Sequence, residues 1–346
     1  MYRYFDSQVH ILKKLQEEVH NREENDLRDI FRGMRVCARY ISSVEYYGIP
    51  ALYYQTREGG FLNKVIFKIH QEINLPFHPP SVCCTATEHY FSHLFTNVIF
   101  APLSESEFLL HLPDLYHELG HCVLVNMESV LKLKPVRDNY YLAFSRVTDY
   151  YNQLLRTKRR EFGPEEISII VEWIHSQWKS WINEFFCDLF ALYTVGPAYA
   201  WSHLHLTTKR SDDIHELTIL QKQTHPSDES RMRILIHGLR SLGFDKEAEK
   251  ISSRWVNMAG YWGLPSAEYQ YAYPNSLLME ITKLILEALR ESGFSAVSHV
   301  TLTNDNGSEI RVMLNEAWEV FWKSKPEEFR SWEEKRVAAL RECLHS

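Results

Sequence analysis

Hydrophobic residues recur three or four positions apart along most of the chain, which is the spacing of one helix face. The pattern predicts helices at about 9–19, 27–41, 61–73, 87–95, 114–131, 139–161, 165–195, 227–242, 277–289 and 308–321. Residues 97–102 are instead short, β-branched in part and ended by a proline, so we expect a strand there. With so few strand signals, the sequence predicts an α+β fold that is predominantly α-helical, with a small β-sheet and helical flanks.

Proline and glycine mark where the predicted helices begin and end. The segment Pro76–Pro80 reads PFHPP and is a candidate boundary, and Pro113 lies where a helix would begin. Gly196–Pro197 ends or kinks the helix that precedes it, and the polar residues 203–223 predict a loop. We expect three regions: a helical region at 1–80, a central region at 81–245 and a second helical region at 246–346.

The composition narrows the classes of partner. The 346 residues are 45% hydrophobic and 24% charged, which excludes a disordered or low-complexity chain. A net charge of -7 argues against a nucleic-acid or anionic-membrane partner. The most apolar stretch, residues 185–201, is short for a membrane span and is interrupted by Asp188. The N-terminus lacks the apolar core of a signal peptide, and the six cysteines form no C-x-x-C pair, so we expect a cytoplasmic protein with reduced thiols.

The sharpest motif reads H-E-L-G-H at residues 117–121, inside a predicted helix. Because residues four apart share a helix face, His117 and His121 can bind one zinc ion while Glu118 lies beside it. A carboxylate in that place can take a proton from an attacking water molecule. Gly120 weakens the helix, which suggests that something approaches its backbone. The alternative is a surface pair of histidines without a metal, but the apolar residues around the motif argue against it.

A second block, residues 183–188, supplies a candidate third ligand. Glu184 and Asp188 are four apart on a strongly apolar helical stretch, so both carboxylates face one side. Glu184 can then complete the metal site, while Asp188 accepts the remaining N–H of a ligand histidine and fixes its ring. The alternative is a salt bridge from these acids to an arginine or lysine elsewhere.

A third block, residues 224–231, joins the predicted polar loop to the start of a helix. His225 can donate to the oxygen that becomes negative when a carbonyl carbon is attacked. Arg231, on the first helical turn, can pair with Asp188 or with another carboxylate of the site. The alternative is ordinary helix capping by Ser227 or Asp228, with a solvated His225.

The order of the three blocks resembles the gluzincin metallopeptidases, and it is similar at all three to the family that includes the CAAX-prenyl proteases. The resemblance spans about residues 97–235. It implies a zincin-like catalytic domain in the central region, and hydrolysis of peptide bonds. It also implies a zinc ion bound by His117, His121 and Glu184, with Glu118 as the general base.

The resemblance gives roles to four further residues. Asp188 would hold a ligand histidine, and Asn183, which opens the same block, is expected to support the site beside it. His225 would donate to the transition state, with Arg231 as its electrostatic support. A peptide or protein substrate follows from these roles.

Three features depart from that family pattern. The gap between His121 and Glu184 is much longer than in thermolysin, a gluzincin. Ser227 and Ser230 replace residues that are more usual in the prenyl proteases. No membrane span is predicted, which argues against a prenylated membrane substrate and against any membrane partner.

Several weaker hypotheses complete the picture. Residues 97–101 precede the metal helix and are placed to bind an extended peptide as an edge strand. The long flanks suggest regulation, by a partner or by self-inhibition. His89 and His93 form a second histidine pair, but no third ligand is evident, and Tyr199 is expected at a core or rim position. The alternative function is a catalytically silent binding or regulatory protein that has a zincin scaffold and a structural metal.

Overall fold

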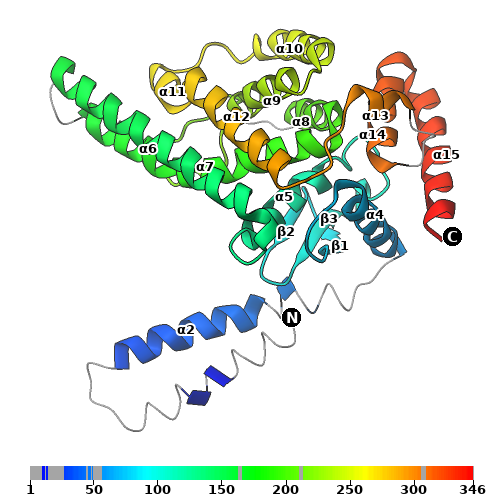
Figure 1. Ribbon diagram of the computed structural model, residues 1–346, viewed down its shortest axis with the longest axis horizontal. Helices are drawn as coiled ribbons and strands as arrows, with labels where there is room; N and C mark the ends of the chain where they lie inside the picture. The colour runs from blue at the N-terminus through cyan, green and yellow to red at the C-terminus, as the bar shows by residue number, and fades with distance from the viewer. Residues whose placement is uncertain are drawn as a thin grey trace. The chain divides into compact units, whose positions relative to one another are not determined.

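In the computed structural model, the chain divides into two units (Figure 1). One unit comprises residues 1–63 and 80–106, and the other comprises residues 64–79 and 107–346. The structure describes residues 10–11, 13–14, 27–43, 46–47, 49, 57–162, 166–209, 213–304 and 309–345. The three regions expected from the sequence, 1–80, 81–245 and 246–346, stay predictions.

Helices account for most of the described residues, and the sheet is small, as expected for a predominantly helical α+β fold. The longer helices are α2 Leu27–Ser43, α4 Arg57–Ile73, α5 Asp114–Asn126, α6 Lys134–Phe162, α7 Glu166–Val195, α8 Pro197–Lys209, α9 Asp228–Ser241, α10 Asp245–Ala259, α12 Asn275–Glu291, α14 Ile310–Lys323 and α15 Pro326–His345. Two short helices are α11 Ala267–Ala272 and α13 His299–Asn304.

Most of the predicted helices are confirmed, with ends that differ by a few residues. The helix predicted at 114–131 is shorter, since α5 ends at Asn126 and a separate 3₁₀ turn follows at Leu131–Leu133. The helix predicted at 9–19 lies largely outside the described residues, as does the predicted helix start at Ser308.

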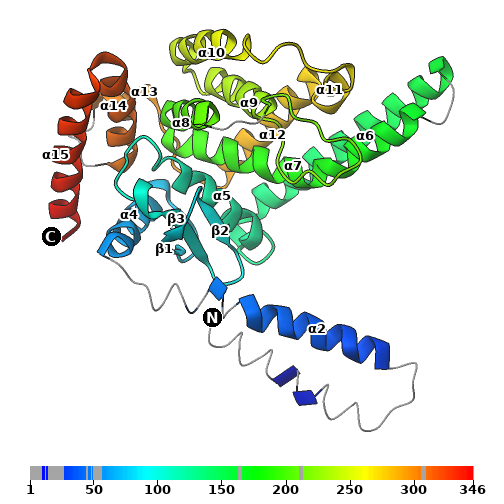
Figure 2. The same cartoon turned by 180° about the vertical axis from the view of Figure 1, so that it is seen from behind.

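The first unit contains a three-stranded sheet in the order β1-β3-β2 (cyan in Figures 1 and 2). β1 (Ser81–Ala86) runs parallel to β3 (Val98–Pro102), and β2 (Phe91–His93) runs antiparallel to it. Phe91 and Phe100 lie opposite each other on β2 and β3, and their rings stack with centroids 4.8 Å apart. Such cross-strand aromatic pairs stabilise a small sheet.

Two predictions about this sheet are wrong. Residues 87–95 contain the strand β2 instead of a helix, because a short run of apolar residues does not distinguish the two periodicities. The strand predicted at 97–101 exists as β3, but it is the central strand and pairs on both sides. Its backbone groups are therefore engaged within the sheet, and β3 is not the edge that a peptide would extend.

In the second unit, α7 is a central helix that contacts α5, α6, α8, α9, α11, α12 and α14. Every residue from Glu184 to Val195 is buried. A helix surrounded in this way needs apolar side chains on all sides, which explains its sequence. α6 and α7 lie side by side over much of their length (green in Figures 1 and 2). Because Glu184 and Asp188 lie in this buried stretch, their carboxylates need polar partners.

The end of α7 is where the sequence placed it, but the loop predicted at 203–223 is partly wrong. α7 ends at Val195 and α8 begins at Pro197, with Gly196 at a φ of 80° between them. α8 then continues to Lys209, and three of its polar residues, Ser202, His203 and Thr207, are buried, with Thr207 bonded along the helix to the carbonyl of His203 (2.9 Å). Across the described residues, none of the helices has the length and apolar character needed to cross a bilayer.

Candidate metal centre

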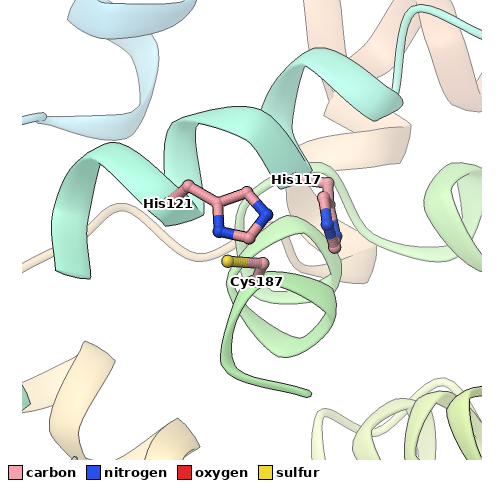
Figure 3. A group of neighbouring side chains, drawn as sticks. All are labelled: His117, His121 and Cys187. Atoms are coloured by element: carbon pink, nitrogen blue, oxygen red, sulfur yellow. The ribbon is translucent and has the colours of Figure 1, made fainter. Parts of the chain in front are cut away.

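The two histidines of the H-E-L-G-H motif lie on one face of α5, which packs against α7 (Figure 3). Their ring centroids are 5.1 Å apart. Gly120 lies between them, and a Cβ atom there would be only 2.8 Å from the Cα of Cys187 on α7. The sequence indicated that something approaches the backbone at Gly120, and the structure identifies it as α7. The close helix contact places both rings over the carboxylates of α7.

Glu184 meets both histidines from the α7 side. One carboxylate oxygen, Oε2, lies 3.3 Å from Nε2 of His117, and the other, Oε1, lies 3.7 Å from Nε2 of His121. Ligands about 2.0–2.1 Å from a tetrahedral zinc ion are separated from one another by roughly 3.3 Å. Glu184 therefore lies against both rings, each through a different oxygen, and its part as the third metal ligand stays a prediction.

The other nitrogen of the His117 ring is held by a buried network. Its Nδ1 lies 3.0 Å from Oδ1 of Asp188 and 2.8 Å from the hydroxyl of Tyr199. Tyr199 donates its hydroxyl proton to Asp188 (2.6 Å), so Nδ1 must carry a proton and act as the donor. The remaining nitrogen, Nε2, is then the one that faces Glu184 and is available to a metal ion. A carboxylate that fixes a histidine in this way is typical of metal sites.

Arg231 completes this network from α9. Its Nε and Nη2 atoms donate to the two oxygens of Asp188, at 2.9 and 2.6 Å, and Nη2 also lies 3.1 Å from the hydroxyl of Tyr199. Such a two-pronged pair compensates the burial of both charges. Asp188 is the partner that the sequence predicted first for Arg231, and the structure shows this pairing. Arg231 therefore touches the site through Asp188.

The carboxylates of Asp188 and Glu184 determine the pKa of the His117 imidazole. Burial opposes a charge on His117, but hydrogen bonds to Asp188 and Glu184 outweigh it and raise the pKa of its imidazole to about 10. Burial alone would raise the pKa of Glu184, yet His117 lowers it to about 2. His117 and Glu184 thus stabilise each other's charged forms.

Glu118 and His225 differ in their exposure to solvent. The Glu118 side chain is adjacent in sequence to His117 and is largely buried (6% exposed). The His225 side chain is 67% exposed, and its Nε2 lies 3.8 Å from Oε1 of Glu184. Its other nitrogen, Nδ1, contacts the hydroxyl of Thr224 at 3.0 Å. The structure therefore brings an exposed imidazole to the edge of the carboxylate that both ligand histidines face.

Helix capping by Ser227 is also present. Its side chain accepts a hydrogen bond from the backbone N–H of Ser230, at the start of α9. The capping alternative and a role for His225 are compatible, because the cap fixes the chain just after this histidine. Asn183 lies on α7 beside Glu184, and its Oδ1 accepts a hydrogen bond from Tyr140 of α6 (2.6 Å).

Cys187 is a further donor that the sequence analysis did not propose. Ligand atoms of His117, His121 and Cys187 all lie within 4.8 Å of one another (Figure 3). The thiol is buried at the α5–α7 crossing, and its Sγ would be 3.1 Å from a Cβ on Gly120. Burial, together with the nearby carboxylates, raises the pKa of this thiol well above its usual range. The Glu184 carboxylate faces Nε2 of both rings, but with a different oxygen to each, so Glu184 and Cys187 are both candidates for the third ligand.

Tyr199 and Tyr140 are the other residues whose part in the site was not predicted. Tyr199 is buried, as expected for a core position, and it also bonds Asp188 and His117 at the centre of the network. No sequence spacing indicates this contact, because it depends on the break at Gly196. The histidine pair His89 and His93 is not part of any metal-type group within the described ranges.

Comparison of the chain with protein-family models, with curated protein sequences and with solved structures gives no match. The resemblance to gluzincins therefore rests on the three short blocks, and the functional argument rests on the geometry of the site.

Proposed function

We propose that the chain is a zinc-dependent metallopeptidase. The observation that carries this proposal is the convergence of His117, His121 and Glu184, with oxygen–nitrogen separations of 3.3 and 3.7 Å. Donors of this type, two imidazoles and one carboxylate, are those of zinc sites that hydrolyse peptide bonds. When bound, zinc would polarise the substrate carbonyl and make a water molecule acidic enough to lose a proton near neutral pH.

The remaining residues of the site would divide the work of catalysis. Glu118 would accept the proton of the attacking water at its carboxylate and pass it to the leaving amine. His225, exposed at the edge of the site, would donate to the carbonyl oxygen as negative charge develops there. Asp188 and Arg231 would hold the His117 ring and would not touch the substrate.

One observation favours a second candidate function. With Cys187 close to both histidines, the site has a fourth protein donor, and a zinc ion bound by four protein ligands is structural. The chain would then be a binding or regulatory protein with a zincin scaffold. Against it, a structural site requires neither Glu118 next to the ligands nor His225 at its edge.

The test compares two single-residue variants, one of the proposed general base and one of a proposed zinc ligand. Glu118→Gln should bind zinc as tightly as the wild type but lose at least about a hundred-fold of its turnover, because the proton acceptor is missing. Glu184→Ala should instead lose zinc. Zinc content is measured by atomic absorption, and cleavage is measured on a broad peptide library by mass spectrometry.

Two results would contradict the proposal. Undiminished cleavage by Glu118→Gln would remove Glu118 from the mechanism. A zinc-loaded wild type that cleaves no peptide, with sulfur in the zinc coordination shell by X-ray absorption, would favour the structural site.

A further inference from the structure

A side chain from a third helix, α14, contacts the break between α7 and α8. Gly196 has a φ of 80°, and Pro197 has no N–H group, so the backbone hydrogen bonds of the two helices do not continue across the break. The C=O of Val195 and the N–H of Ala198 would be bonded internally in a continuous helix. Here both groups bond to the side chain of Asn315 on α14.

Both polar atoms of the Asn315 side-chain amide form hydrogen bonds. Its Nδ2 donates to the carbonyl of Val195 (2.7 Å) and to that of Arg311 (2.7 Å), and its Oδ1 accepts from the N–H of Ala198 (3.0 Å). The reverse orientation of the amide would place Oδ1 against two carbonyl oxygens, so this one is fixed. Asn315 thus joins the end of α7 to the start of α8.

This junction determines whether Tyr199 can reach Asp188. In a continuous helix, residues 11 positions apart are about 16 Å apart along the axis, beyond the reach of the two side chains. The change of direction at Gly196 brings the Tyr199 hydroxyl to 2.6 Å from Oδ1 of Asp188 and 2.8 Å from Nδ1 of His117. The direction of α8 therefore sets the orientation of the His117 ring.

We propose that Asn315 is a positioning residue for the metal centre, which fixes the α7–α8 junction and so holds Tyr199 against Asp188 and His117. The inference rests on the proposed function, because it assigns Asn315 a part in the same metal site. It also gives the C-terminal part of the chain a role there, which the sequence blocks at 117–121, 183–188 and 224–231 do not indicate.

The first experiment measures the zinc dissociation constant by competition with a chromogenic chelator. Asn315→Ala should weaken zinc binding roughly ten-fold, as loss of an outer hydrogen-bond partner of a ligand does. Tyr199→Phe should weaken it by at least as much. If Asn315 acts through Tyr199, the double variant should bind zinc no more weakly than Tyr199→Phe alone. Additive losses, or unchanged affinity in Asn315→Ala, would overturn the inference.

A matched control separates positioning from general destabilisation. The Tyr151 hydroxyl also has three buried partners: it contacts the carbonyls of Tyr271 and Ala272 and accepts from Trp178. Tyr151→Phe should lower the melting temperature to a similar extent and leave the zinc dissociation constant unchanged. An equal loss of zinc affinity in Tyr151→Phe would mean that Asn315 acts only through stability.

A second readout needs no metal. In the zinc-free protein, the proton on Nδ1 of His117 is held by Asp188 and Tyr199, and it should give a slowly exchanging imidazole resonance in the NMR spectrum. Asn315→Ala should broaden or abolish that resonance, and Tyr151→Phe should keep it. A wild type that binds no zinc would contradict the proposed function. If the resonance still responds in this way, Asn315 nevertheless holds Tyr199 against Asp188 and His117. An unchanged resonance in Asn315→Ala contradicts the inference whatever the zinc result.

Discussion

At the scale of single residues, the two carboxylates of α7 have separate tasks because they face different nitrogens of one imidazole. Glu184 faces Nε2 of His117, and Asp188 faces Nδ1. Among the described residues, Glu184 also faces His121, whereas Asp188 forms an ion pair with Arg231. Removing Asp188 would leave Arg231 as an uncompensated buried charge, which costs about 3–5 kcal/mol of stability. Removing Glu184 leaves the buried His117 imidazole, which can lose its proton, whereas the Arg231 guanidinium cannot.

A comparison of Glu184 with Cys187 decides which is the third ligand. Glu184→Gln should weaken zinc binding well beyond ten-fold, because a neutral amide replaces the charged oxygen that faces both rings. Cys187→Ser should leave the dissociation constant within about two-fold, since the thiol packs at the helix crossing. Both constants follow from chelator competition. The opposite ranking would make Cys187 a ligand and support a structural metal.

At the same scale, the sequence predicted Asp188 and Arg231 as supports of His117, but it did not predict the part of Tyr199. His117, His121, Glu184 and Asp188 share faces of two helices, and spacing along a helix is fixed by local geometry. The contact of Tyr199 with Asp188 depends on a change of chain direction, so spacing gave no sign of it.

At the scale of elements, the approach of α5 to α7 is the contact on which the site depends. Gly120 permits it, because its missing side chain lets the Cα of Cys187 come close. The sequence showed only that this glycine is unfavourable for a helix. The packing shows why a larger residue is excluded: the obstacle is backbone, which cannot rotate away.

Two alanine substitutions test this contact. Gly120→Ala should lower the free energy of unfolding by about 1–3 kcal/mol, because overpacking outweighs the gain in helix propensity. It should also weaken zinc binding. Gly60→Ala in α4 is the control: nothing lies within 4 Å of its added Cβ, so it should raise stability by up to about 1 kcal/mol. Urea denaturation measures both. Equal effects at the two positions would contradict the packing argument.

At the scale of the whole second unit, two carboxyl groups bind backbone N–H groups between segments far apart in the sequence. Glu72 of α4 accepts from the N–H of Ile310, and Glu333 of α15 accepts from that of Leu109, at 2.9 and 2.8 Å. Burial raises the pKa of each carboxyl from 4.5 to about 7 despite these hydrogen bonds. The C-terminal helices are thus joined to the rest of the unit by acids that hold their protons up to near-neutral pH.

These two acids should make stability depend on pH. The folded state binds their protons more tightly than the unfolded state between pH 4.5 and about 7, so the stability they contribute is full below pH 4.5 and falls as pH rises through 7. Glu72→Gln and Glu333→Gln keep the hydrogen-bond acceptor but cannot ionise. The free energy of unfolding of each variant, minus that of the wild type, should therefore be larger at pH 8 than at pH 5. Urea denaturation at the two pH values provides the measurement, and a pH-independent difference would contradict the raised pKa values.

The sequence by itself determined most of the longer helices, the break at Gly196–Pro197 and the placement of His117 and His121 on one helix face, since all of these depend on neighbours within a few residues. Tertiary structure alone decided the rest. It placed β3 inside the sheet instead of at its edge, turned α8 so that Tyr199 meets Asp188, and set Asn315 of α14 against the junction of α7 and α8. These contacts join residues far apart in the chain, and their partners are chosen by packing and by the need of buried polar groups for hydrogen bonds, which no local pattern encodes.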